Sequence, residues 1–316
     1  MTQDIALIVK ELSLGHVVAL PTETVYGLAA NAMHESAIKK VFSIKGRPLT
    51  HPLIMHVADH WDLSPWVKYI PPYAYALMQR YWPGPLTLVF HLNLAASLSP
   101  LITGGQNTIA IRCPNHPKTL QVLRELGQPI VMPSANPFGK ISPTQAIHVY
   151  QDFPESDFLI LEGGRCEVGI ESTILDASVK DKAQILRQGR VTARDLQDFV
   201  QLYQTNSTMK VSGCLKHHYQ PDKPLYYFDA SHLDKISAEL LKSSSVLIFS
   251  TAFELNVPHL FVFSSCSNQA EAAFYSELRH ADTKDVKQIL IELPPDSFAW
   301  QGLRDRIKRA GQSLKR

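Results

Sequence analysis

The spacing of apolar residues predicts alternating helices and strands over the first 203 residues. Apolar side chains recur at helical spacing between residues 4 and 14, and Gly15 follows as a helix stop. Residues 16–20 form a short continuous apolar run, which is typical of a buried strand. Further helices are predicted at 37–44, 72–81, 119–126 and 191–203, and further strands at 52–57, 86–91, 108–112, 130–132, 158–161 and 172–175. Mixed strands with interspersed helices predict an α/β or α+β sheet domain.

A change of pattern divides this region from the rest of the chain. Residues 204–224 lose all periodicity and are rich in polar residues, Gly and Pro, which is typical of a linker. After it, strands are predicted at 225–228, 246–249, 260–263 and 286–293, and helices at 233–242, 269–279 and 302–310. This alternation predicts a small Rossmann-like, parallel, three-layer α/β domain. The predicted organisation is therefore a domain at 1–203, a linker at 204–224 and a domain at 225–316.

Composition narrows the class of protein. The 316 residues are 45% hydrophobic and carry a net charge of only +2, which excludes a disordered chain and leaves no bulk field for holding nucleic acid. No apolar run approaches the ~20 residues of a membrane-spanning helix. The four cysteines lie about fifty residues apart with no Cys-x-x-Cys, so we expect buried, inert thiols and a reducing, cytoplasmic location. They are Cys113, Cys166, Cys214 and Cys266.

Common catalytic and nucleotide-binding motifs are missing from the sequence. It has no Gly-rich phosphate loop, no nucleophile elbow and no His-Glu-x-x-His helix. His56 and His60 are four residues apart, but they lie in a strand-like run that does not place both rings on one helix face. We therefore expect no metal bound directly by protein side chains.

Two polar clusters in the first sixty residues could form a binding site. Thr22, Glu23 and Thr24 follow a buried strand, where hydroxyls and a carboxylate can bind a small polar ligand. A turn with side-chain caps is the equal alternative. Lys45 and Arg47 flank a glycine, an arrangement that can meet phosphate oxygens while the backbone approaches closely. For these two cations an exposed basic turn is the alternative.

Two further clusters follow predicted strands. Arg112 shares one face of its strand with Thr108 and Ala110, and an arginine in so apolar a run should pair with a ligand carboxylate, a phosphate or a buried acid. Ser134 and Asn136 offer donors and acceptors suited to a nucleotide, although an Asn-Pro pair alone would indicate only a turn. Together these patterns predict an anion-binding or nucleotide-binding pocket. They do not identify its ligand.

The combined motifs resemble those of the YrdC/Sua5 family. They are Pro21-Thr-Glu-Thr-Val-Tyr-Gly-Leu28, Lys45-x-Arg-Pro48, Pro52-Leu-Ile-x-His56, Pro133-Ser-Ala-Asn136, Gly169-Ile-Glu-Ser-Thr173 and Leu186-Arg-x-Gly189. Residues 212–221 and 305–310 resemble the linker and the end of the longer, Sua5-type members. The resemblance implies a YrdC-like twisted mixed sheet with helices. It also implies an L-threonylcarbamoyladenylate synthase, a nucleotidyltransferase of tRNA t6A37 biosynthesis.

The family reaction implies the ligands and the site residues. L-threonine, bicarbonate and ATP, with Mg2+ bound to the ATP, give threonylcarbamoyl-AMP and pyrophosphate. By resemblance, the catalytic residues are Lys45, Arg47 and Arg112. The implied ATP-binding residues are Lys45, Arg47, His51, Thr108, Ser134, Asn136, Ser142, Arg187, His218 and Tyr219. The implied threonine-binding residues are Thr22, Thr24, His56, Arg112 and Ser172.

The resemblance also suggests partners and two alternatives. In this family the linker that carries His218 and Tyr219 can fold over the pocket and shield the labile product. The downstream t6A transferase machinery is the implied partner, with weak contact to tRNA or double-stranded RNA and none to membrane. The main alternative is an RNA-binding module that uses a basic concave surface. Carbamoyl transfer in hydrogenase maturation is a weaker one, because those proteins carry zinc-binding cysteine pairs. The basic last helix, with Arg306, is expected to be a solvated face.

Overall fold

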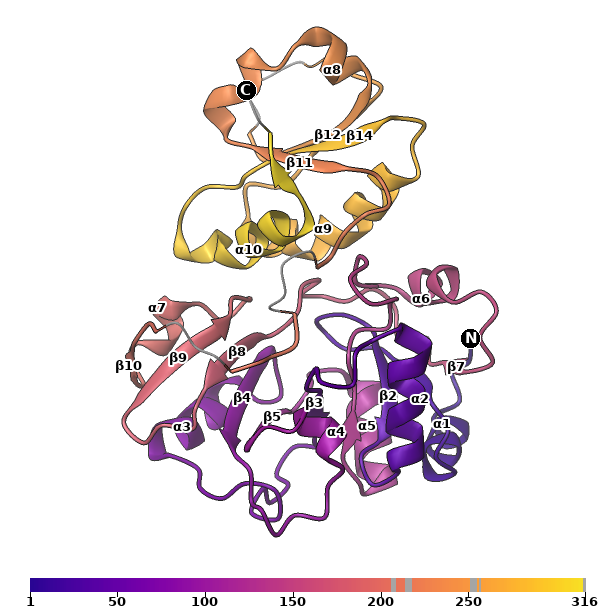
Figure 1. The fold of residues 1–316 in the computed structure, drawn as a ribbon, viewed down its shortest axis with the longest axis vertical. Helices are drawn as coiled ribbons and strands as arrows, with labels where there is room; N and C mark the ends of the chain where they lie inside the picture. Colours follow the sequence, from indigo (N-terminus) through magenta and orange to yellow (C-terminus); the bar gives the residue numbers. More distant parts are fainter. Residues whose placement is uncertain (206–208, 214–217, 251–254, 256, 315–316) are drawn as a thin grey trace. The chain divides into compact units, whose positions relative to one another are not determined.

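The computed structural model describes residues 1–205, 209–213, 218–250, 255 and 257–314. The chain divides into two compact units (Figure 1). The N-terminal unit comprises Met1–Phe138 and Pro143–Cys214, and the C-terminal unit comprises Gly139–Ser142 and Leu215–Arg316. The described part of the predicted linker is thus shared between the two units. Cys214 lies outside the described residues.

A ten-stranded mixed sheet forms the N-terminal unit, in the order β10-β9-β8-β4-β5-β3-β6-β2-β1-β7. Its strands are β1 Val18–Leu20, β2 Gly27–Asn31, β3 Ile54–His56, β4 Leu86–His91, β5 Thr108–Arg112, β6 Ile130–Val131, β7 Leu159–Ile160, β8 Thr173–Asp176, β9 Lys182–Arg187 and β10 Gln201–Leu202. Its helices are α1 Ile5–Ser13, α2 Glu35–Lys45, α3 Pro72–Tyr81, α4 Pro100–Thr103, α5 Pro117–Leu126, α6 Ala146–Asp152 and α7 Ala193–Leu196. The mixed sheet with interspersed helices confirms the predicted fold class.

Strict alternation on the central strands separates the core from the opposite face. Leu88 and Phe90 of β4 pack into the main hydrophobic core together with Ile111 of β5. Val89 and Ala110 point to the other face, where they pack against Val211. Residues 209–213, which we call the strap, therefore cover part of the sheet face that the helices leave open. This period of two places every second side chain of β4 and β5 on that face.

Most predicted elements of the N-terminal unit are confirmed, and β4, β5 and α3 match to the residue. The helix predicted at 191–203 is wrong. Thr192 and Asp195 form a capping box that begins α7, but this helix ends at Leu196, and the chain then pairs as β10 in parallel with β9. Strand β2 was not predicted, because its Gly-Leu-Ala-Ala-Asn sequence lacks β-branched residues and depends on pairing with β1 and β6.

The C-terminal unit has a five-stranded sheet in the order β13-β12-β14-β11-β15, with every pairing parallel. Its strands are β11 Leu225–Phe228, β12 Ser244–Ile248, β13 His259–Val262, β14 Gln288–Glu292 and β15 Gln312–Ser313. Figure 1 shows α8 (Ala238–Lys242) on one side of this sheet, and α9 (Ser267–Asp282) and α10 (Gln301–Ala310) on the other. The predicted parallel three-layer arrangement is confirmed. The single helix predicted at 233–242 is wrong, since a 3-10 helix at Ala230–Lys235 precedes α8.

Gly46 ends helix α2 in the left-handed conformation, with a φ of 63°, and separates Lys45 from Arg47. A side chain there would meet no neighbouring atom, so the cost of a substitution is confined to the backbone. We predict that Gly46→Ala destabilises the protein by about 1 kcal/mol and lowers its Tm by roughly 2–4 °C, whereas Gly46→Asn loses less. Thermal unfolding followed by circular dichroism measures both variants. An unchanged Tm in Gly46→Ala would contradict the prediction.

Candidate functional site

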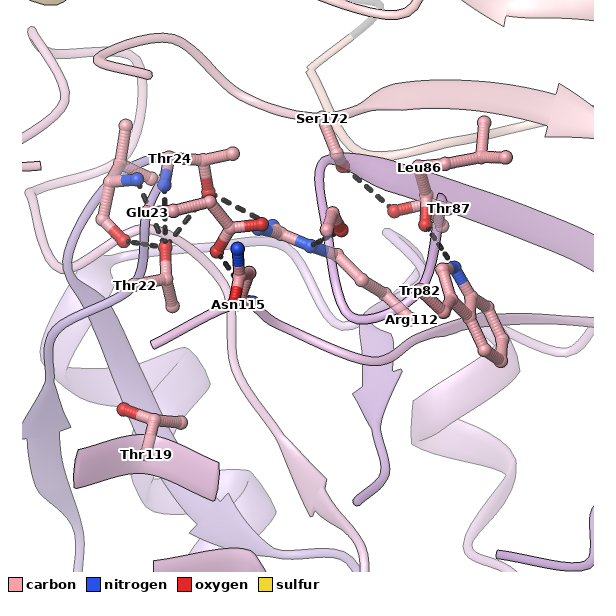
Figure 2. A network of polar contacts seen from close by, with 12 residues as sticks. Thr22, Glu23, Thr24, Trp82, Leu86, Thr87, Arg112, Asn115, Thr119 and Ser172 are labelled. Carbon is pink, nitrogen blue, oxygen red and sulfur yellow. Dashed lines mark hydrogen bonds and ion pairs between the residues drawn. The ribbon is translucent and has the colours of Figure 1, made fainter. Parts of the chain in front are cut away.

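The guanidinium of Arg112 is the centre of a buried polar network (Figure 2). Arg112 ends β5, lies beside His56 of β3 in the strand register, and is 4% exposed. Its Nε donates to the Gly84 carbonyl at 3.1 Å and its Nη1 to Thr24 Oγ1 at 2.9 Å. Its Nη2 lies 2.6 Å from Glu23 Oε1. Two hydrogen bonds and one ion pair to described residues therefore fix the plane of the guanidinium.

The two threonine hydroxyls extend this network in one direction. Thr22 Oγ1 donates to the Val25 carbonyl at 2.6 Å, so the 2.8 Å contact between Thr22 and Thr24 requires Thr24 to be the donor. Thr24 in turn accepts from Arg112. Thr22 Oγ1 also accepts the backbone N–H groups of Thr24 and Val25, so its hydroxyl is fully used within its own turn. Of the residues Thr22 and Thr24, both predicted to bind the substrate threonine, Thr24 is the one that contacts Arg112 directly.

His56 is held as a neutral ring beside Arg112. Its Nδ1 lies 3.1 Å from the Ile54 carbonyl, which can only accept, so Nδ1 carries the proton and Nε2 is an acceptor. Burial, and then the neighbouring Arg112 charge, lowers the pKa of His56 to about 3. The imidazole therefore stays uncharged throughout the physiological range and can accept a hydrogen bond from a ligand.

Ser172 joins a second part of the site to Arg187. Its Oγ lies 2.7 Å from Thr87 Oγ1 and accepts from Arg187 Nη2 at 3.1 Å. Arg187 Nε donates to the Ser172 carbonyl and Nη1 to the Ser212 carbonyl of the strap. Gly189 permits this arrangement, because a Cβ there would lie 2.5 Å from the backbone nitrogen of Thr173. One predicted threonine ligand and one predicted ATP ligand are thus in direct contact.

The predicted phosphate-binding cations are buried, so the alternative of an exposed basic turn is wrong. Lys45 Nζ donates to the carbonyls of Ser134 and Asn136, which brings three predicted ATP-binding residues together. Burial, and then the charge of Arg47, holds the pKa of Lys45 well below its ordinary value. Arg47 donates to the Pro52 carbonyl at 2.8 Å.

The ring of Phe138 contacts two of the predicted ATP-binding residues, Arg47 and His51. The guanidinium of Arg47 lies over it, 5.7 Å from the ring centroid. The imidazole of His51 lies on the same ring at a centroid distance of 5.3 Å. Burial, and then Arg47, also lowers the pKa of His51.

The remaining predicted site residues lie in two places. Thr108 lines a small hollow beneath the strap, where Gln106 exchanges two hydrogen bonds of 2.9 Å with the backbone of Lys210. Ser142, His218 and Tyr219 belong to the C-terminal unit, and their binding of ATP stays a prediction.

The Tyr219 ring is buried within the C-terminal unit. Its φ is +66°, and it packs against Tyr275 at 5.9 Å and His218 at 4.2 Å. The guanidinium of Arg306 lies 5.2 Å from its centroid. The expectation of a solvated basic face is wrong for Arg306, which is fully buried.

Sequence reasoning missed Thr87 and Phe138 as members of the site, and it named Glu23 as a possible ligand-binding carboxylate but not as the partner of Arg112. Glu23 stood within a recognised motif, but nothing in the sequence pointed to its ion pair with a residue 89 positions away. Thr87 had a weak indication, since it is a polar residue in the apolar run of β4. Phe138 follows an Asn-Pro turn, and its sequence position gave no indication of contact with Arg47.

Three of the four cysteines lie among the described residues, and two of them are buried. Cys113 and Cys166 are buried, as predicted, and burial raises the pKa of the Cys113 thiol to about 12 and raises that of Cys166 as well, which disfavours the reactive thiolate. Cys266, by contrast, is exposed, and the expectation of burial is wrong for it.

No group of three or more His, Cys, Asp or Glu side chains placed to hold a metal ion occurs in the described part of the chain. Across the same residues, no helix combines the length and apolar character needed to cross a membrane.

Two family models match the chain, one for each part. Residues 10–189 match the Sua5/YciO/YrdC family, described as "Telomere recombination", and residues 184–311 match the threonylcarbamoyl-AMP synthase C-terminal domain. The first match alone covers more than half of the 316 residues. The matched range includes all of the residues described above as contacts of Arg112, Lys45 and Ser172.

Whole-chain relatives agree with these matches. A threonylcarbamoyl-AMP synthase of Bacillus subtilis is 36% identical over 93% of this chain and 89% of the relative. The enzyme of the same name from Pyrococcus abyssi is 32% identical over 94% and 90%. A crystal structure of P. abyssi Sua5 complexed with L-threonine matches with a TM-score of 0.85 and 30% identity, covering 98% of this chain and 96% of that one. The chain belongs to the Sua5/YciO/YrdC family, in its two-domain form with a threonylcarbamoyl-AMP synthase C-terminal domain.

Proposed function

We propose that this protein is an L-threonylcarbamoyladenylate synthase, which condenses L-threonine, bicarbonate and ATP to threonylcarbamoyl-AMP and pyrophosphate. The observation that carries the proposal is the buried Arg112, fixed in plane beside the neutral His56 and the hydroxyl of Thr24. This set suits an amino acid, because a guanidinium binds a carboxylate bidentately and an uncharged imidazole accepts from an amine or hydroxyl. Relatives named for this activity, and a relative with bound L-threonine, support it.

The reaction needs no protein nucleophile. The neutral amine of threonine adds to CO2 derived from bicarbonate and loses a proton, giving a carbamate. A carbamate oxygen then attacks the α-phosphorus of ATP, and the bond to pyrophosphate breaks. The protein has to orient three reactants and stabilise the spreading negative charge. Arg112 is proposed to bind the threonine carboxylate, with Thr22 or Thr24, His56 and Ser172 around the rest of that molecule.

The cations are proposed to act on the nucleotide. Lys45, Arg47 and Arg187 are buried, and Lys45 donates to the carbonyls of Ser134 and Asn136 while Arg187 donates to Ser172. A buried ammonium with a lowered pKa gains a compensating charge when a phosphate approaches, so ATP should favour the protonated form of Lys45. His51, Thr108, Ser142, His218 and Tyr219 complete the proposed ATP site.

Magnesium fits this site as a companion of ATP. The described site offers hydroxyls, amides and cations rather than a carboxylate cluster, so we expect the phosphates and water to hold the ion. Bound there, it would neutralise phosphate charge.

The cellular setting follows from the proposed product. Threonylcarbamoyl-AMP would pass to the transferase machinery of tRNA t6A37, with at most weak contact to tRNA or double-stranded RNA. We infer a cytoplasmic location, which the free thiols of Cys113 and Cys166 support. RNA binding alone would leave the buried Arg112 network without a use.

The proposed reaction predicts a strict dependence on both small substrates. The protein with ATP, Mg2+, bicarbonate and labelled L-threonine should release pyrophosphate and form an AMP-linked product, and omitting threonine or bicarbonate should abolish both. Arg112→Ala should lower kcat/KM for threonine by roughly a hundredfold or more, because it removes a charged hydrogen-bonding partner. Threonine-independent pyrophosphate release would contradict the synthase proposal. Retention of RNA at low salt, lost at high salt, would then favour the alternative.

Because His56 is buried as a neutral ring, we predict that the free energy of unfolding falls as the pH is lowered. Its pKa is about 3 when folded and about 6.5 when unfolded, so the unfolded chain binds one more proton between these values. Stability is therefore fully present above pH 6.5 and falls by roughly 1.4 kcal/mol per pH unit as the pH is lowered toward 3. His56→Gln should remove this part of the slope. Denaturant unfolding of both proteins at pH 7, 6 and 5 measures it, and equal slopes would contradict the assignment.

The packing of the strap on the sheet predicts that a charge at position 211 weakens ATP binding. This residue is 8% exposed and packs on Ile54, Val89 and Ile174. Val211→Asp would bury a charge against that apolar face and should release the strap, raising the KM for ATP severalfold through loss of the Ser212 contact to Arg187. Val211→Ile, which keeps the apolar contact, is the matched control. Equal KM values for all three proteins would show that the strap has no part in ATP binding.

A further inference from the structure

Glu23 is a second carboxylate on the guanidinium that is proposed to bind threonine. Its side chain is 3% exposed, and Oε1 lies 2.6 Å from Arg112 Nη2. Oε2 accepts the backbone N–H of Asn115 at 3.0 Å, and the backbone carbonyl of Glu23 accepts from Val168 at 2.7 Å. The segment 112–115 therefore holds both carboxylate oxygens, and Val168 fixes the backbone from which the side chain extends.

This anchoring determines where Arg112 can present its remaining donors. An arginine side chain is long and has several rotatable bonds, so its direction has to be fixed by contacts. Gly84, Thr24 and Glu23 take Nε, Nη1 and Nη2 respectively. Figure 2 shows the guanidinium pointing toward Glu23 and Thr24. Without Glu23, the Nη2 end would lose its charged partner, and the direction of the remaining N–H groups would no longer be set.

We propose that Glu23 is the positioning residue for substrate carboxylate recognition: by its ion pair it fixes the plane of Arg112, and so it determines where the carboxylate of threonine binds. The inference rests on the proposed function. Glu23 acts through Arg112 and need not touch a reacting atom. Glu23 and the ligand carboxylate would share the charge of one guanidinium. The site therefore favours a carboxylate that binds the N–H groups of Arg112 not used by Gly84, Thr24 and Glu23, and it disfavours a ligand that would have to displace these partners.

The isosteric variant Glu23→Gln tests this role. A glutamine amide can accept from Arg112 or from the Asn115 N–H through its one oxygen, but its nitrogen cannot replace the second acceptor. The KM for threonine should rise roughly tenfold, as expected for losing the charged partner of Arg112, while the KM for ATP changes less than twofold. Glu162→Gln is the matched control, since Glu162 accepts from Gly164 and Tyr26 at another part of the same unit. Equal changes in both KM values for Glu23→Gln would overturn the positioning role.

A double-mutant cycle separates action through Arg112 from general damage. Glu23→Gln introduced into Arg112→Lys should change the KM for threonine by less than twofold, because the planar fork it orients is gone. Additive effects would overturn the proposal. Should Glu23→Gln fail to fold, as judged by thermal unfolding, Glu23→Asp takes its place. Its shorter side chain keeps the charge but does not reach both partners, so its threonine KM should also rise.

Direct binding distinguishes failure of this inference from failure of the proposed reaction. Titration calorimetry with L-threonine gives a Kd without catalysis. Wild-type protein that binds threonine but forms no adenylate would contradict the reaction, and a weaker Kd in Glu23→Gln would still support the role of Glu23. An active wild type with an unchanged Kd in Glu23→Gln would overturn the role and leave the reaction intact. Wild type that binds no threonine would overturn both.

Discussion

The burial of four cations around one sheet is the constraint on which the N-terminal unit depends. Lys45, Arg47, Arg112 and Arg187 are each less than 8% exposed, and a buried charge without partners would cost several kcal/mol. Each one donates to backbone carbonyls of a different loop. The loops are therefore held in place by the same groups that are proposed to bind the substrates. Burial, and then the charge of Arg47, lowers the pKa of Lys45, and an anionic ligand would relieve the repulsion between these two cations.

The alternation of the central strands explains how such a polar site can lie beside a large core. On β4 and β5 one set of side chains belongs to the hydrophobic core, and the set between them faces the strap. A shift of one residue in either strand would exchange the two faces, so register and site are specified together. Arg187, bonded to both Ser172 and Ser212, links this sheet face to the strap. ATP binding and strap position should therefore depend on each other.

The local pattern of apolar and polar residues predicted an element well where the element buries one face and exposes or covers the other differently. Strands β4 and β5 and helix α3 were correct to the residue for this reason. Strand β2 and the end of the helix predicted at 191–203 depend on partners distant in sequence, which no local pattern contains. The site followed the same rule: Arg112 was recognisable as an arginine in an apolar strand, but its partner Glu23 was not. Family resemblance supplied the substrates, which periodicity could not.

The missing nucleophile and the buried cations have one explanation. A reaction in which threonine provides the amine and ATP provides the leaving group requires no covalent intermediate on the protein, so its catalytic groups have only to bind and orient. Orientation is more accurate when each group is fixed by a neighbour before the substrate arrives. Glu23 for Arg112, and Thr87 for Ser172, are such neighbours. Their burial makes them look structural, yet the geometry of the proposed substrate site would depend on them directly.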